Sequence, residues 1–212
     1  MSNSYPHPWE RRVWIGTRPG ARSALPSFSD TGPLRAWRRG TSKPWPERCH
    51  PWASRWVLVT QPYRIEGNPR VADEQSLDRA WTAIWPRVCA VGAPLVAGGR
   101  SAGSQVACRT ARALGAQAVL ALAYPLLGPG SPAELLATGK PTLVVQGGQD
   151  PFGRPDQFPS LLPDMELVAI PSANHMFATG RPSGGPEPVA QLTEAVIESL
   201  DRRLRLDMMQ GP

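Results

Sequence analysis

Three residues that together could carry out acyl transfer each lie just past an apolar run of the sequence: Ser101, Asp150 and His175. A serine hydroxyl becomes nucleophilic when a neutral imidazole accepts its proton, and a carboxylate can hold that imidazole in the required tautomer. His175 is the only histidine after residue 50, so it is the one candidate base for Ser101 in this part of the chain. Taken singly, such residues are most often structural or solvated. Their joint arrangement predicts that Ser101 is the nucleophile, Asp150 the acid and His175 the base.

The sequence around Ser101 is typical of a sharp turn between a strand and a helix. Ser101 is the central residue of a G-x-S-x-G pentapeptide, and the helical pattern 104–114 follows it. Small flanking residues let the chain reverse without a clash, and the turn pushes the tip side chain out of the sheet. Free N–H groups at the start of the next helix favour negative charge. We therefore expect the backbone N–H of Ala102 to be one oxyanion donor.

The elements that must position these residues alternate between strand and helix patterns. Apolar runs predict buried strands over 56–60, 94–98, 118–124, 142–146 and 166–170. Pure apolar runs separated by helices indicate a parallel sheet that is covered on both faces. Because parallel strands end at the same edge of a sheet, the three candidate residues should meet there.

Two helices flank this pattern. Asp73 is predicted to cap a helix, and the last helix is predicted over about residues 187–205. The residues expected on the buried faces of these two helices are Leu77, Trp81, Ile84 and Val88, and then Val189, Leu192, Val196, Leu200 and Leu204.

The motifs resemble those of a known family. Residues 98–103, 144–153 and 173–175 are similar to segments of small α/β-hydrolases like dienelactone hydrolase, and more narrowly to the KANL/Tex hydrolase-like subgroup, over about residues 56–204. The resemblance implies an α/β-hydrolase fold in which Ser101, Asp150 and His175 are nucleophile, acid and base. Relatives normally take a second oxyanion donor from a His-Gly-x-Gly-Gly-type loop, and the sequence has no match to it. The alternative source of the second oxyanion donor is the segment near Gln61–Tyr63.

The first 55 residues differ in composition from the remainder. Residues 1–56 hold six of the eight tryptophans and a net charge of +7, which exceeds the net charge of +6 of the whole chain. They contain no apolar run of four or more, so we expect an irregular basic segment over 1–55 and an α/β-hydrolase domain over 56–206. A chain beginning near Arg55 is then expected to be as stable as the full chain. The segment is interpreted in three ways: a nucleic-acid-binding arm, a solvated tail, or an out-of-frame translation of GC-rich DNA.

The sequence therefore predicts a serine hydrolase that acts on a small-molecule ester or related acyl substrate. The alternatives are a non-catalytic or truncated α/β-hydrolase-like protein without a complete oxyanion hole and, third, a nucleic-acid-binding protein. No cofactor or metal is expected, because Cys49, Cys89 and Cys108 lack metal-ligand spacing. The odd cysteine count and the lack of a long apolar run predict a cytoplasmic protein without membrane contact. The pattern predicts neither the substrate nor the oligomeric state.

Overall fold

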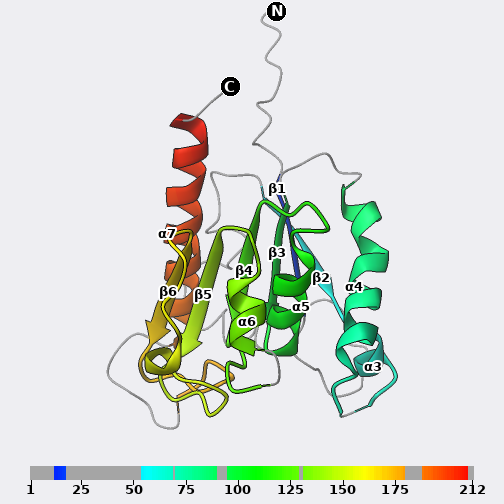
Figure 1. The fold of residues 1–212 in the computed structure, drawn as a ribbon, viewed down its shortest axis with the longest axis horizontal. Coiled ribbons are helices and arrows are strands. Elements are labelled where there is room, and N and C mark those ends of the chain that lie inside the picture. Colours follow the sequence, from blue (N-terminus) through cyan, green and yellow to red (C-terminus); the bar gives the residue numbers. More distant parts are fainter. Residues whose placement is uncertain are drawn as a thin grey trace, which may run out of the picture.

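The computed structural model describes residues 12–17, 54–68, 70–89, 95–128, 131–179 and 188–209. Six strands of this part form one parallel sheet in the order β2-β1-β3-β4-β5-β6 (Figure 1). The five predicted strands are found, each within two residues of its expected ends. The strands are β1 (Arg12–Thr17), β2 (Ser54–Val59), β3 (Leu95–Arg100), β4 (Ala118–Leu122), β5 (Thr142–Gly147) and β6 (Met165–Ile170).

Helices cover both faces of this sheet, as the sequence predicts. Residues of α4, α5 and α6 share one buried cluster, and residues of α7 share a second cluster with the opposite face of the sheet. The fold class is therefore confirmed as an α/β fold with a parallel sheet. The helices are α3 (Pro62–Ile65), α4 (Glu74–Cys89), α5 (Ala102–Thr110), α6 (Ser131–Leu136), the short 3₁₀ helix η2 (Pro155–Gln157) and α7 (Pro188–Met209).

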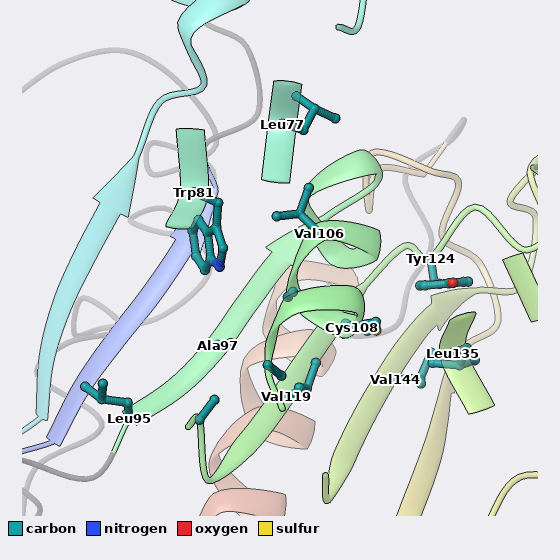
Figure 2. Packing of buried hydrophobic residues seen from close by; sticks show 14 of the residues in the cluster. Leu77, Trp81, Leu95, Ala97, Val106, Cys108, Val119, Tyr124, Leu135 and Val144 are labelled. Carbon is teal, nitrogen blue, oxygen red and sulfur yellow. The ribbon is translucent and has the colours of Figure 1, made fainter. Parts of the chain in front are cut away.

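The two clusters follow from the period of the strands. Successive side chains of a strand point to opposite faces, so Val96 joins the α7 cluster while Ala97 joins the cluster beneath α4 and α5. Figure 2 shows the cluster beneath α4 and α5, where Trp81 and Val106 from these two helices pack over the sheet. Each fully buried aliphatic side chain contributes about 1.5–3 kcal/mol relative to exposure. The sheet that carries the candidate residues is thus anchored from both sides.

Helix α4 agrees with its prediction at the start and differs in its buried stripe. Asp73 caps it, since Asp73 Oδ1 accepts a hydrogen bond of 2.9 Å from the backbone N–H of Ser76. Hydrogen bonds from the Ser76 side chain and backbone lower the pKa of Asp73. The buried stripe contains Trp85 in place of Ile84, which is only half-buried. Trp85 can be buried because its Nε1–H donates to the carbonyl of Leu114 at 2.6 Å.

The expectation of irregular chain over residues 1–55 is wrong at Arg12–Thr17. This segment is strand β1, and it lies between β2 and β3 with Ile15 level with both Val57 and Ala97. Its sequence contains only three consecutive apolar residues, but Val, Trp, Ile and Thr are all strong strand formers. Pairing on both edges supplies the stabilisation that a longer apolar run would otherwise give. Residues 1–11 and 18–53, which include the rest of the predicted irregular segment, lie outside the described residues.

Helix α7 extends to Met209, four residues beyond its predicted end. Leu192 and Val196 are buried in it as predicted, whereas the side chains of Leu200 and Leu204 lie outside the described part. Among the helices described, none is long and apolar enough to cross a membrane.

Candidate active site

Ser101 lies at the tip of a tight turn between β3 and α5. Its backbone has φ 56° and ψ −129°, a left-handed conformation that side-chain-bearing residues rarely adopt. The turn closes so tightly that a Cβ atom on Gly99 would collide with the backbone of Gly103. Ser104 Oγ also donates to the Ser101 carbonyl at 2.6 Å. The nucleophile elbow predicted from the G-x-S-x-G sequence is thus present, and glycine is required at position 99.

The three predicted residues meet at the carboxyl edge of the sheet. His175 Nε2 lies 3.0 Å from Ser101 Oγ, and His175 Nδ1 lies 2.8 Å from Asp150 Oδ2. An ionised carboxylate can only accept hydrogen bonds, so the proton of the neutral imidazole belongs on Nδ1. The unprotonated Nε2 then faces the serine hydroxyl. This arrangement can deprotonate Ser101 as it attacks a carbonyl carbon.

Asp150 is held as an acceptor by its surroundings. It follows β5, is 1% exposed, and receives hydrogen bonds from the backbone N–H of Phe152 at 2.9 Å and from Gln146 Nε2 at 3.0 Å. Together with His175 Nδ1, these contacts give the carboxyl group three N–H partners. The carboxyl group is therefore held in place beside His175 although it is buried.

Gln146 is a residue of this site that the sequence analysis missed. Its side chain is fully buried, and its Oε1 accepts the backbone N–H of Tyr124 at 2.8 Å, which fixes the orientation of the amide. Its Nε2 therefore faces Asp150 Oδ2 and the carbonyl of Gly153, which is 2.7 Å away. The signal that could have identified it is an amide side chain within the apolar run 142–146, because a buried polar side chain needs partners.

The His175 loop is packed against the turn that carries the acid. A Cβ atom on Gly147 would lie 2.5 Å from the carbonyl oxygen of Ala173, so only glycine permits this approach. Within the loop, Asn174 Oδ1 accepts the backbone N–H groups of Met176 at 2.8 Å and Ala178 at 3.2 Å. These bonds fix the backbone of the residues that follow His175. The base is thus positioned by its loop as well as by Asp150.

A family model described as an alpha/beta hydrolase domain matches residues 60–201, which is more than half of the chain. The chain belongs to this α/β-hydrolase family. A search of curated protein sequences finds no match to this chain.

Solved structures of other α/β-hydrolases resemble the fold of this α/β-hydrolase domain. A serine hydrolase without a lid, XC6422 from Xanthomonas campestris, has a TM-score of 0.63 at 18% identity over 90% of this chain and 81% of its own. A serine hydrolase homologue from Coxiella burnetii has a TM-score of 0.60 at 17% identity, over 89% and 84%. The esterase domain of a Rhodothermus marinus protein has a TM-score of 0.56 at 12% identity, over 92% and 88%. At these identities the likeness shows a shared fold.

Ala102, the predicted oxyanion donor, is the first residue of α5 and directly follows Ser101. The first N–H groups of a helix have no acceptor within the helix, so that of Ala102 is available to a ligand beside Ser101. On one side β3 pairs with β1, and β2, which leads to Gln61–Tyr63, lies one strand further away.

Two cysteines, Cys89 and Cys108, lie in the described part of the chain. No group of three or more histidine, cysteine or acidic residues in that part could hold a metal ion. Burial raises the pKa of the Cys108 thiol to about 12, so the thiol is un-ionised near neutral pH and a poor nucleophile. Cys89 is exposed, and Cys49 lies outside the described residues.

Proposed function

We propose that this α/β-hydrolase domain is a serine hydrolase that cleaves an ester or related acyl substrate, with Ser101 as nucleophile, His175 as base and Asp150 as the residue that orients it. The observation that carries the proposal is the continuous chain of contacts from Asp150 through His175 to Ser101, with the serine on a strained turn. α/β-hydrolases carry out their chemistry with polar residues connected in this way at the carboxyl edge of a parallel sheet.

The reaction would proceed in two halves. Ser101 Oγ attacks the carbonyl carbon while His175 Nε2 takes the hydroxyl proton, and Asp150 stabilises the resulting imidazolium. The oxyanion that forms is stabilised by the Ala102 N–H. The intermediate collapses when the carbon–oxygen bond to the leaving group breaks and His175 returns the proton to that oxygen. Water, deprotonated by His175, then attacks the acyl carbon. The bond to Ser101 Oγ breaks, His175 returns the proton to that oxygen, and the acid is released.

A second oxyanion donor would have to reach the turn that holds Ser101. Because β1 pairs directly with β3, the carboxyl end of β1 adjoins that turn. Residues 18–53, which follow β1, lie outside the described part of the chain.

The narrower features expected from the sequence belong to the same proposal. They are membership of the dienelactone hydrolase-like or KANL/Tex-like subgroup, a small-molecule acyl substrate and a cytoplasmic location without a nucleic-acid partner. The competing candidate is a non-catalytic or truncated α/β-hydrolase-like protein. The absence of a His-Gly-x-Gly-Gly-type motif from the sequence favours it, because one missing oxyanion donor costs about 100- to 1000-fold in rate.

Labelling with a fluorophosphonate tests the proposal. The full-length protein should be labelled at Ser101, with labelling abolished in Ser101→Ala and strongly reduced in His175→Ala, because the probe reacts only with an activated serine. The matched control is Ser160→Ala, which removes an exposed loop serine and should leave labelling unchanged. Absence of labelling in the folded wild-type protein would favour the non-catalytic alternative.

A further inference from the structure

Three large apolar side chains are exposed on the loops that surround His175. Leu127, Phe152 and Met176 are 63%, 51% and 55% exposed, and they follow β4, β5 and β6 respectively. These strands end at one edge of the sheet, so the loops after them gather there (Figure 1). Exposed apolar side chains that cluster mark binding surfaces, whereas scattered ones need no explanation. We refer to these three residues as the apolar rim.

Direct contacts tie the apolar rim to the catalytic base. The ring of Phe152 lies against the ring of His175, with the centroids 4.6 Å apart and the planes tilted by 58°. The backbone N–H of Leu127 donates to the carbonyl of Phe152 at 2.9 Å, which joins the two loops. Met176 directly follows His175 in the sequence. The apolar rim is therefore on the His175 side of the nucleophile.

This side of the site faces one particular half of an ester. Under the proposed function, His175 Nε2 gives its proton to the oxygen of the departing alcohol, so that oxygen must come within hydrogen-bond reach of His175. The acyl half stays bonded to Ser101 Oγ. The group attached to the leaving oxygen is consequently the part of the substrate nearest to Phe152 and Met176.

We propose that the apolar rim binds the alcohol half of the substrate, and that the natural substrate is an ester of a neutral, apolar alcohol such as an aryl or alkyl alcohol. This inference rests on the proposed function and adds to it the chemical class of the leaving group. In the step concerned, the acyl carbon–oxygen bond breaks, the acyl carbon remains on Ser101, and the alcohol leaves with the proton from His175.

Charge at the apolar rim supports a neutral alcohol over a cationic one. Arg100 Nη1 lies 3.2 Å from the sulfur of Met176, so a guanidinium group adjoins the apolar rim. Partial burial, followed by the nearby charge of Arg64, lowers the pKa of Arg100, but a guanidinium stays charged at neutral pH. A cationic alcohol such as choline would be repelled by this group.

Acetate esters that differ only in the alcohol provide the test, because they share one acyl-enzyme and one deacylation step. In Phe152→Ala, kcat/KM for phenyl acetate should fall about tenfold relative to the wild type, whereas kcat/KM for methyl acetate should change less than twofold. Comparing each ester with itself removes differences in intrinsic reactivity. Lengthening the acyl chain from phenyl acetate to phenyl butyrate should not alter the loss. The matched control is Leu162→Ala, an exposed apolar residue that precedes β6 at the opposite edge of the sheet.

Three outcomes would overturn the assignment. Equal losses for phenyl and methyl acetate would mean that Phe152 acts only on His175. A loss that depends on the acyl chain would place the acyl half at the apolar rim. Unchanged kinetics, with a dimer that Phe152→Asp converts to a monomer, would make the apolar rim an interface between copies of the chain.

Binding of phenol separates failure of this inference from failure of the proposed function. The methyl signal of Met176 in the NMR spectrum should shift saturably with phenol in the wild type, and the shift should weaken in Phe152→Ala. This readout needs no turnover. A Met176 signal that does not respond to phenol would contradict the inference even if Ser101 is labelled normally.

Discussion

The sheet has two parts that differ in how strongly their sequences specify them. Strands β3 and β5 are buried along almost their whole length, and β3, β5 and β6 each lead into a loop that carries a candidate catalytic residue. In β2, by contrast, Val57 and Val59 are only half-buried and Leu58 is exposed, as expected for an edge strand. The difference teaches that two candidate catalytic residues, Ser101 and Asp150, follow strongly patterned strands, whereas β6, which leads to His175, is mostly half-buried. The expected second oxyanion donor belongs to the weakly patterned part.

The largest expected effect comes from removing β1, which separates the two parts. A chain beginning at Arg55 loses the strand between β2 and β3, and it should lose most of the 5–15 kcal/mol that stabilises a typical domain. This reverses the expectation from composition alone. A chain beginning at Glu10, which keeps β1, is the control and should melt like the full chain. Thermal melts of the three proteins measure the effect, and equal melting temperatures for all three would show that β1 is dispensable.

Within the strongly patterned part, Asp150→Asn should lower kcat for p-nitrophenyl acetate by about 10⁴-fold while the protein stays folded. An amide at this position can no longer hold the proton of His175 on Nδ1. Asp156→Asn, a change of an exposed aspartate on η2, is the control. If Asp150→Asn retained more than a tenth of the wild-type rate, a different acid would have to orient His175.

Gln146→Met should lower kcat by about 100-fold, because the carboxylate of Asp150 loses a donor that holds its position. Val144→Ala is a matched control on the same strand, fully buried but apolar. It should lower the melting temperature and leave kcat nearly unchanged, and an equally small loss of kcat in Gln146→Met would reduce Gln146 to a packing role.

The smallest expected effect concerns the weakly patterned part. Replacing the chain that follows Thr17 by a glycine-rich loop should raise the rate of fluorophosphonate labelling at least tenfold, since a second oxyanion donor contributes about 100- to 1000-fold when well placed. A loop of the same length rich in serine is the control. Labelling that is unchanged by the glycine-rich loop would indicate that the oxyanion hole is already complete.

The sequence was most informative where chemistry and pattern coincide. The meeting of Ser101, Asp150 and His175 could be predicted because each follows an apolar run, and such runs end at one edge of a parallel sheet. Gln146 was not predicted, because its role depends on Tyr124, which follows β4, and on Gly153 in the turn after Asp150, and only the folded chain brings these together. Trp85 was missed because it and Ile84 fit the helical period equally well, and the choice depends on an acceptor at Leu114.

Strand β1 was missed for a different physical reason. A strand with neighbours on both edges gains its stability from pairing with residues far along the chain, such as Val57 and Ala97 for Ile15. A local apolar run is not needed for this, so a search for such runs cannot detect it. Regions of this kind are specified by their neighbours more than by their own sequence.

The strained backbone of Ser101 lowers the stability of the fold at the position that supplies the hydroxyl group for the proposed reaction. Its φ of 56° is a conformation that glycine adopts freely, whereas serine adopts it at a cost of about 1–3 kcal/mol. Ser101→Gly would relieve that strain and raise the melting temperature by several degrees, while removing the hydroxyl group altogether. Selection for thermal stability alone would therefore move this position toward glycine, and any attempt to engineer a more robust variant has to leave this strained residue untouched.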